Sequence, residues 1–464
     1  MPITIRIVNN VRAVMEGDFK PGAVDKLLRF RPEGFQWMRA FTQGAWDGYI
    51  RLFNSNGNSF PAGCVSIIQG KYKSLKVIDE RVDPELWDGK VPKTLLDTKL
   101  GHITLRPDQR HVIRVALQAT RGVLKVATSG GKTEITAGLV LALGVPKTLI
   151  VVPNRKLVSQ TIKRLEMRLG VRVGHISHGK WEPEQVTVAI PKTLGSAKFR
   201  QQRAKLFGSV VLMIIDECHH NPAKEWISLT SKCKAYYRFG LSGTPLDRND
   251  GTTLRLIGTT GPLLVDVRAE TLVEQGIIAK PYVEIVEVDK PMLPGNLPYQ
   301  DAYKLGIVKN INFHKVVVKL IKREYAAGHI TLVLVTHIAH GEYLSKHLKV
   351  MAPLIPHEFV WSKTKEEALD ILVSKFDRGE LRVLIASPIF GEGADIPAVD
   401  TLIIADAGKS IIKVIQKAGR ALRAKHGKEN KCRIIDFAHL THPMLAGHSA
   451  ERIKVYEREG FTFV

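Results

Sequence analysis

From about residue 97 onward, short continuous runs of apolar and β-branched residues alternate with stretches whose apolar positions recur at helical spacing. A continuous apolar run is typical of a parallel strand that is covered by helices on both faces. The alternation of such strands with helices therefore predicts an α/β fold with buried parallel sheets. The predicted strands are Val123–Ala127, Thr148–Val152, Val186–Ile190, Val210–Ile215, Thr331–Val335, Val383–Ala386 and Thr401–Ile404.

This pattern is interrupted at two nearby places in one region of the chain. Around Lys280-Pro281, and again across Lys290–Pro298, the sequence contains Pro and Gly and is predicted to be extended. The break divides the region into two tandem α/β lobes, which we place at residues 97–275 and 276–464. Residues 1–96 differ, because they contain short alternating strands, Gly/Asn turns and one helical stretch. A small α+β domain is expected there.

The net charge of the chain indicates which class of partner it binds. The 68 Lys and Arg residues exceed the 45 Asp and Glu residues by 23. Such a surplus attracts polyanions, so nucleic acid is the expected partner; a basic surface that serves only solubility is the alternative. No apolar run approaches the roughly 20 residues of a membrane span, and the N-terminus lacks a secretory signal. A cytoplasmic protein with no membrane partner is expected.

A glycine-rich loop follows the first predicted strand of the first lobe. Its sequence is Thr128-Ser129-Gly130-Gly131-Lys132-Thr133, and a helical pattern begins directly after it. Glycines let backbone N–H groups approach phosphates, Lys132 can neutralise β/γ-phosphate charge, and the Thr133 hydroxyl can bind Mg²⁺. An ordinary glycine-rich turn before a helix is the alternative, since the strict phosphate-loop pattern has a glycine where Val126 stands.

Two carboxylates end the strand Val210–Ile215. Asp216 and Glu217 come first, followed by Cys218, His219 and His220. At the carboxyl end of a strand, Asp216 can hold Mg²⁺ while Glu217 orients and deprotonates an attacking water molecule. A polar strand end without function is the alternative. A metal site at the two histidines is not favoured, because no third ligand is spaced nearby.

Further short segments accompany these two elements in a fixed order. They are Leu105-Arg106-Pro107-Asp108-Gln109, Val152-Pro153-Asn154-Arg155, Pro191-Lys192-Thr193-Leu194 and Leu241-Ser242-Gly243-Thr244-Pro245. Over residues 103–440 the order resembles that of superfamily 2 helicases and translocases. The resemblance implies that the segment with Arg106 and Gln109 reads adenine and that Ser242 and Thr244 couple hydrolysis to movement. It also implies nucleic-acid backbone contacts at Pro153, Asn154, Arg155 and Thr193.

The second lobe continues the resemblance. Its matching segments are Val333–His337, Ile385–Pro397 and Gln416–Arg423. The resemblance implies further nucleic-acid contacts at Thr336, His337 and Ser387, nucleotide contacts at Gly393 and Asp395, and a catalytic helix with Gln416, Arg420 and Arg423. The two arginines would act as fingers on the γ-phosphate. Spacings of four and three residues place these three side chains on one helical face, although a solvated basic face has the same spacing.

The acidic box Asp216-Glu217-Cys218-His219 and the segment Gly391–Pro397 are more similar to DNA-directed members than to RNA helicases, and most similar to phage UvsW-type branch-migration helicases. The implied fold is two tandem RecA-like parallel-sheet lobes. The implied function is ATP-dependent unwinding or branch migration of forked and four-way DNA in replication, recombination or repair. ATP and Mg²⁺ are the implied cofactors. Branched, forked or single-stranded DNA, bound largely without sequence preference, is the implied partner, in a bacterial or phage-infected host cytoplasm. An RNA helicase and a nucleotide-switched DNA-remodelling factor are the alternatives.

Aromatic and basic residues alternate in the N-terminal region. Such a mixture can stack on bases and hold phosphates, whereas a domain of under 100 residues also needs large side chains for its core. We expect most of the aromatic rings to be buried and the basic residues to be the better candidates for nucleic-acid contact. The aromatic residues are Phe35, Trp37, Phe41, Trp46, Tyr49 and Phe53, with Arg39 and Arg51 among them.

Overall fold

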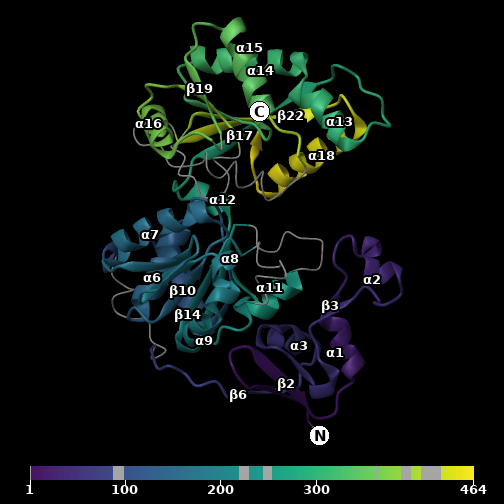
Figure 1. The fold of residues 1–464 in the computed structure, drawn as a ribbon, viewed down its shortest axis with the longest axis vertical. Helices are drawn as coiled ribbons and strands as arrows, with labels where there is room; N and C mark the ends of the chain where they lie inside the picture. The colour runs from purple at the N-terminus through teal and green to yellow at the C-terminus, as the bar shows by residue number, and fades with distance from the viewer. Residues whose placement is uncertain are drawn as a thin grey trace. The chain divides into compact units, whose positions relative to one another are not determined.

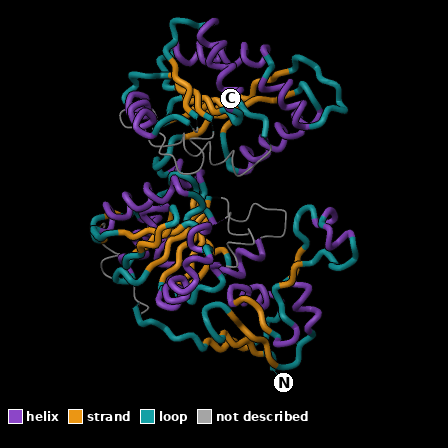
Figure 2. The backbone as a smooth tube through the Cα atoms, in the orientation of Figure 1, coloured by secondary structure: helices purple, strands orange, loops and turns teal. Residues whose placement is uncertain are grey.

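The computed structural model of the protein describes residues 2–86, 99–218, 229–243, 253–361, 363–387, 399–408 and 430–464. The chain folds into two compact units. Unit 1 extends to Asp266 and unit 2 begins at Val267, and the short loop Ala127–Gly130 is grouped with unit 2. Figure 1 labels the elements, and Figure 2 shows a sheet flanked by helices in each unit. None of the described helices is both long enough and apolar enough to cross a membrane.

Unit 1 contains an eight-stranded sheet with the order β12-β11-β13-β10-β14-β15-β9-β16. Its central strands β13, β10, β14, β15 and β9 run parallel. Every residue of β10 and β13 is buried, as the continuous apolar runs predict. The strands are β9 (Arg121–Val126), β10 (Thr148–Val151), β11 (Val173–Ser177), β12 (Lys180–Glu182), β13 (Val186–Ala189), β14 (Leu212–Asp216), β15 (Tyr237–Ser242) and β16 (Leu263–Val267). The helices are α5 (Pro107–Ala119), α6 (Lys132–Ala142), α7 (Arg155–Leu169), α8 (Pro191–Leu194), α9 (Arg200–Ser209) and α11 (Thr253–Thr259).

Unit 2 contains a seven-stranded sheet with the order β19-β20-β18-β21-β22-β17-β23. All of its described pairings are parallel. The strands are β17 (Lys280–Val288), β18 (Thr331–Leu334), β19 (His357–Val360), β20 (Val383–Ala386), β21 (Thr401–Ile404), β22 (Lys431–His439) and β23 (Thr462–Phe463). The helices are α12 (Ala269–Glu274), α13 (Tyr299–Tyr303), α14 (Ile311–Ala326), α15 (Ile338–Met351), α16 (Glu366–Asp377) and α18 (Pro443–Arg458). The prediction of two RecA-like parallel-sheet lobes is confirmed.

The sequence predicts a break in the alternation of strands and helices at Lys280-Pro281, whereas the structure has a strand there. The segment begins the nine-residue strand β17, which pairs with β22 along its whole length. Proline lacks the N–H that a central strand needs, so it is tolerated where a strand has one neighbour only. The second neighbour, β23, pairs with Tyr282 and Val283 but not with Pro281. The proline therefore stands at an edge position.

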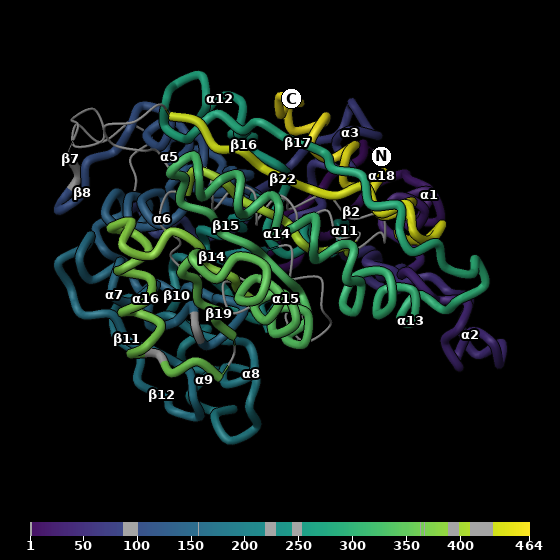
Figure 3. Tube along the Cα trace, turned by 90° about the horizontal axis from the view of Figure 1, so that it is seen from above, coloured from purple at the N-terminus to yellow at the C-terminus, as the bar shows by residue number. Residues whose placement is uncertain are grey.

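The N-terminal residues form a smaller sheet with the order β5-β2-β1-β6. Its strands are β1 (Thr4–Ile7), β2 (Arg12–Glu16), β5 (Ser59–Pro61) and β6 (Lys76–Asp79), accompanied by α1 (Pro21–Leu27) and α3 (Val65–Lys71). Between β3 (Arg29–Phe30) and β4 (Ile50–Arg51) the chain makes an excursion over residues 31–49, which we call the arm. The arm carries the short helix α2 (Arg39–Thr42), which lies apart from α1, α3 and β2 in two perpendicular views (Figures 1 and 3).

The N-terminal region contacts the rest of unit 1 through hydrogen bonds from side chains to backbone and through one close approach of two backbones. Arg121 of β9 donates a hydrogen bond to the carbonyl oxygen of Asn10 (3.3 Å), and the Asn10 amide donates to the carbonyl oxygen of Lys234 (2.8 Å). A Cβ atom added at Gly63 would lie 2.0 Å from the carbonyl oxygen of Ile257, so the two backbones approach as closely as glycine allows. The division at residue 96 stays a prediction, but these contacts tie the two sheets together.

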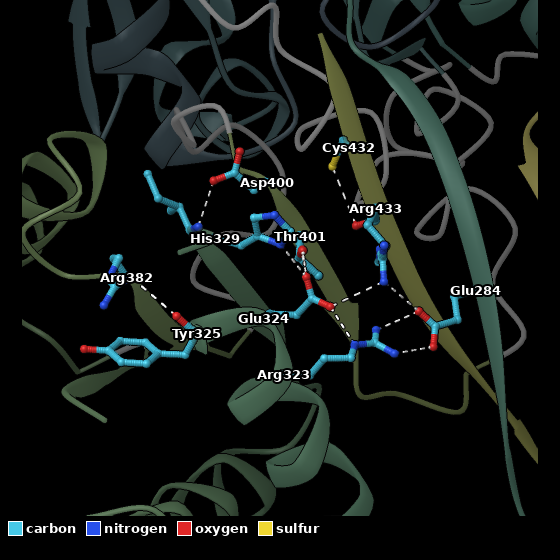
Figure 4. Close-up of polar contacts among 11 residues, drawn as sticks. Glu284, Arg323, Glu324, Tyr325, His329, Arg382, Asp400, Thr401, Cys432 and Arg433 are labelled. Atoms are coloured by element: carbon cyan, nitrogen blue, oxygen red, sulfur yellow. Dashed lines mark hydrogen bonds and ion pairs between the residues drawn. The ribbon is translucent and has the colours of Figure 1, made fainter. Parts of the chain in front are cut away.

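A polar network around a buried carboxylate joins strands and helix at the amino-terminal edge of the unit 2 sheet (Figure 4). Glu324, only 1% exposed, accepts hydrogen bonds from Thr401 (2.6 Å), His329 (2.7 Å) and Arg323 (2.9 Å). Burial alone would raise the pKa of Glu324, but these partners lower it below its usual value. A second carboxylate, Glu284 of β17, accepts two hydrogen bonds from Arg323. The network lies at the edge opposite to the carboxyl ends of the strands and serves the fold.

His314, His340 and His439 lie buried around Phe313 in the core of unit 2. His314 stacks on His340 (ring centroids 5.1 Å apart), and the Phe313 ring meets His439 edge-on (4.9 Å). None of the described residues offers a hydrogen bond to either ring nitrogen of His340 or His439. Burial lowers the pKa of His314 to about 4 and the pKa values of His340 and His439 to about 3. All three rings are therefore neutral at neutral pH.

These histidines predict that unit 2 loses stability in mild acid. Their pKa values are lower in the folded than in the unfolded chain, so acid favours unfolding as the pH falls from about 6.5 toward about 4. Replacement of His340 by leucine removes one titrating ring of similar size. We expect thermal melting of His340→Leu to depend less on pH between 7.5 and 5 than melting of the wild type. An exposed histidine provides the control, His178→Leu, which should melt with the wild-type pH dependence; an equally steep decline in His340→Leu would contradict the assignment.

Candidate phosphate-binding site and nucleic-acid contacts

The glycine-rich loop lies between β9 and α6, as its sequence predicts. β9 ends at Val126 and α6 begins at Lys132. Two loop residues have left-handed backbone conformations, Ser129 (φ +66°) and Gly131 (φ +88°). These conformations let the chain reverse within a few residues and start the helix, so that the first N–H groups of α6 are available to an anion.

The acidic box lies at the same edge of the sheet as this loop. Asp216, the last residue of β14, pairs with Leu241 of β15, and Ser242, which ends β15, pairs with Lys125 of β9. Because the three strands are parallel neighbours, their carboxyl ends meet at one edge. The register therefore places Asp216, the buried Ser242 and the glycine-rich loop in one row.

The structure brings Lys132 and Glu217 into direct contact. The Lys132 Nζ atom lies 2.6 Å from Glu217 Oε1, and the two side chains are 17% and 18% exposed. Glu217 has a left-handed backbone conformation (φ +47°), and its N–H donates a hydrogen bond to Asp216 Oδ1 (2.9 Å). A residue other than glycine is rarely found in this conformation, and its backbone strain is of a kind that clusters at functional sites.

The three charged groups shift one another's protonation equilibria. Burial raises the pKa of Asp216, the Glu217 charge raises it further, and Lys132 opposes both, so that it reaches about 6. Burial alone would lower the pKa of Lys132, but the charges of Glu217 and Asp216 raise it above its usual value. Lys132 is therefore charged, and among the described residues of the site the two carboxylates exceed the lysine by one.

Gln109 lies against the glycine-rich loop. It sits in the first turn of α5, where its side chain accepts a hydrogen bond from the Arg106 N–H (3.0 Å), and it is 1% exposed. A Cβ atom added at Gly131 would lie 2.1 Å from Gln109 Nε2. Gly131 is thus required both for its conformation and for the close approach of the amide. The role of Gln109 in reading adenine stays a prediction, but its place beside the loop fits it.

The first-lobe segments expected to contact nucleic acid follow two adjacent parallel strands, β10 and β13. Asn154 caps α7 by accepting a hydrogen bond from the Leu157 N–H (3.2 Å), and Arg155 is exposed. Pro153 is partly buried, and Thr193 in α8 is 5% exposed, so its hydroxyl has little access to a ligand. The neighbouring Lys192 belongs to the same motif and is exposed. It is a further candidate for a nucleic-acid contact, and it was not predicted from the sequence.

The second-lobe segments follow β18 and β20, which are parallel neighbours. His337 is exposed at the start of α15, and its ring lies 4.9 Å from that of Tyr303. Thr336 is partly buried, whereas Ser387 is 3% exposed and its N–H donates a hydrogen bond to the Val360 carbonyl oxygen (3.0 Å). Six predicted site residues lie outside the described residues, namely Thr244, Gly393, Asp395, Gln416, Arg420 and Arg423.

Two family models match the chain, one in each lobe. Residues 102–247 match the model described as the res subunit of type III restriction enzymes, and residues 313–425 match the helicase conserved C-terminal domain. The ATP-dependent DNA helicase uvsW of Enterobacteria phage T4 is 26% identical over 94% of this chain and 93% of its own length. The DNA 3'-5' translocase XPB2 of Sulfurisphaera tokodaii is 28% identical over 70% of this chain and 79% of its own length.

A solved structure supports the fold. Saccharomyces cerevisiae Dbp5 bound to RNA and ADP BeF3 matches with a TM-score of 0.52 at 16% identity, covering 82% of this chain and 94% of that one. The two models matched in this order, together with the uvsW relative, show that the chain belongs to the superfamily 2 helicases and is an ATP-hydrolysing enzyme. Within that superfamily it is close to the UvsW helicases.

The charge of Asp216 is predicted to lower the stability of the protein when no ligand is bound. The pKa of Asp216 is raised to about 6 in the folded chain, so the ionised group costs stability above that pH, and the cost vanishes below about 4, where both states are protonated. We expect Asp216→Asn to raise the melting temperature of the nucleotide-free protein by roughly 2–4 °C at pH 7.5. The gain should shrink at pH 5.

The control for this measurement is Asp108→Asn. Asp108 lies 2.9 Å from Arg106, so its removal breaks a pair and should not stabilise the protein. A lower melting temperature of Asp216→Asn than of the wild type at pH 7.5 would show that the Asp216 charge is well compensated.

Proposed function

We propose that this helicase uses ATP hydrolysis to move along DNA and to remodel branched DNA, such as forks and four-way junctions, in replication, recombination or repair. The contact between Lys132 and Glu217, in a loop and a strand end of the kind that binds a nucleotide, is the observation that carries the proposal. The relatives named as a DNA helicase and a DNA translocase support DNA as the substrate. The surplus of 23 basic residues supports a polyanion.

The catalytic steps assigned to the first lobe follow from the charges of the site. Lys132 leaves Glu217 and binds the β- and γ-phosphates of ATP. Glu217, released from its lysine, then orients a water molecule and accepts its proton. Mg²⁺ supplies further neutralisation of phosphate charge, and the residues that would hold it are Asp216 and Thr133. Burial and then the Glu217 charge raise the pKa of Asp216, and a divalent cation would stabilise its ionised form, so this residue fits the role.

The second lobe supplies the groups that sense the γ-phosphate. We assign this role to Gln416, Arg420 and Arg423, with Gly393 and Asp395 near the nucleotide. Closure of the lobes around ATP and reopening after hydrolysis would shift the nucleic-acid contacts of one lobe past those of the other. Contacts to phosphate and sugar carry no direct base readout, so movement should depend little on sequence.

ATP turnover measured with a panel of nucleic acids tests the proposal. We expect DNA to accelerate hydrolysis, with forks and four-way junctions more effective than plain duplex of equal length. Lys132→Ala should abolish turnover on every substrate, because no charge then neutralises the β/γ-phosphates. A matched control is Lys125→Ala, which removes a lysine of β9 that pairs with Asp266 outside the loop. It should leave the turnover close to that of the wild type.

Three outcomes would contradict the proposal. Preferential acceleration by RNA would identify an RNA helicase. Equal acceleration by junctions and plain duplex would remove the preference for branches. Nucleotide binding without turnover on any substrate would identify a nucleotide-dependent switch.

A further inference from the structure

The arm, residues 31–49, is a small packed structure of its own within the N-terminal region. The rings of Phe35 and Phe41 meet edge-on with centroids 4.9 Å apart, and Gly48 (φ +82°) is buried against both. The Trp46 indole N–H donates a hydrogen bond to the Tyr49 carbonyl oxygen (2.8 Å). These contacts involve three of the five aromatic rings of the arm, those of Phe35, Phe41 and Trp46.

Arginines hold this packed structure to its base. The guanidinium groups of Arg29 and Arg31 lie over the Tyr49 ring at 4.3 and 4.4 Å, and Arg31 also lies 4.8 Å from the centroid of Phe35. At the base, β3 and β4 pair in antiparallel register, with Arg29 opposite Arg51. Cation–π contacts and a strand pair of this kind hold the arm in place. The remaining aromatic ring of the arm takes no part in them.

The remaining ring, Trp37, is turned outward. It is 82% exposed, and the adjacent Met38 is 42% exposed. Tryptophan is highly buried on average, so a nearly bare indole on an otherwise packed arm has no role in holding the fold. Arg39 follows two residues later and is also exposed. The arm thus presents a flat aromatic ring beside a cation.

We propose that Trp37 stacks on an unpaired base of a DNA strand at a branch while Arg39 contacts the adjoining phosphate. This inference rests on the proposed function, since it requires that the chain binds DNA. An indole ring offers a face to any base, so the contact is independent of sequence. In a fully paired duplex the base faces are already stacked on one another. The contact therefore distinguishes strands with unpaired bases from plain duplex.

Binding of fluorescent single-stranded, forked and plain duplex DNA by the full chain tests the inference. Trp37→Ala should weaken binding of single-stranded and forked DNA by about fivefold to 150-fold, the range of one lost base stack, and leave duplex binding unchanged. Trp37→Phe should retain most of the affinity. Met38→Ala, which removes a neighbouring exposed apolar side chain, should behave as the wild type. Melting curves of all variants should coincide, because the indole supports no packing.

A second DNA substrate tests the same contact from the DNA side, because it lacks the bases while the protein keeps the Trp37 ring. Forks whose unpaired arms carry abasic sites keep their phosphates but offer nothing to stack on. We expect the wild type to bind them as weakly as Trp37→Ala does, and the two proteins to be indistinguishable on them.

The outcomes separate this inference from the proposed function. Wild-type failure to bind any DNA would overturn both. Normal DNA binding by the wild type together with unchanged binding by Trp37→Ala would overturn the inference alone. The exposed indole would then be assigned to contact with a protein partner. An equal loss on duplex and forked DNA would also overturn the inference, because stacking on unpaired bases cannot produce that result.

Discussion

The contact between Lys132 and Glu217 is the interaction around which unit 1 is arranged. It forms because β14, β15 and β9 are parallel neighbours whose carboxyl ends meet at one edge, with the lysine on the loop after β9 and the glutamate directly after β14. A charge-assisted hydrogen bond of 2.6 Å between partly buried groups is among the stronger polar contacts of a fold. The same two groups are those to which we assign phosphate binding and the activation of water.

Without a nucleotide, Lys132 is therefore paired with Glu217, the carboxylate to which we assign the role of base. Asp216 lies beside the pair, so among the described residues of the site the carboxylates exceed the lysine by one, and burial together with the Glu217 charge raises the pKa of Asp216 to about 6. A ligand that brings its own cation would relieve this excess, whereas a ligand that brings only phosphates must compete with Glu217 for Lys132. Stability and catalysis therefore make opposite demands on these three residues.

Local patterns in the sequence were sufficient to predict seven strands of the two large sheets, the loop and the acidic box, but they missed strands such as β15 and β22. The buried strand β14 is a continuous apolar run that ends in two acids, and a strand of this kind is recognisable without a partner. Features that depend on contacts between distant residues could not be predicted. The register that pairs Asp216 with Leu241, the approach of Gln109 to Gly131 and the hydrogen bond from Asn10 to Lys234 all belong to this class. The exposure of Trp37 could not be predicted either, because an aromatic residue among other aromatic residues is expected to be buried.

The affinity of the enzyme for the non-hydrolysable nucleotide adenylyl imidodiphosphate tests most directly whether Glu217 holds Lys132 before ATP binds. In Glu217→Gln the lysine is free, so calorimetry should find binding roughly tenfold tighter than in the wild type. Glu134→Gln is a charge-matched control, because Glu134 lies in the first turn of α6 but pairs with Arg168 at 3.1 Å. Its affinity should change much less. Equal or weaker binding by Glu217→Gln would contradict the account.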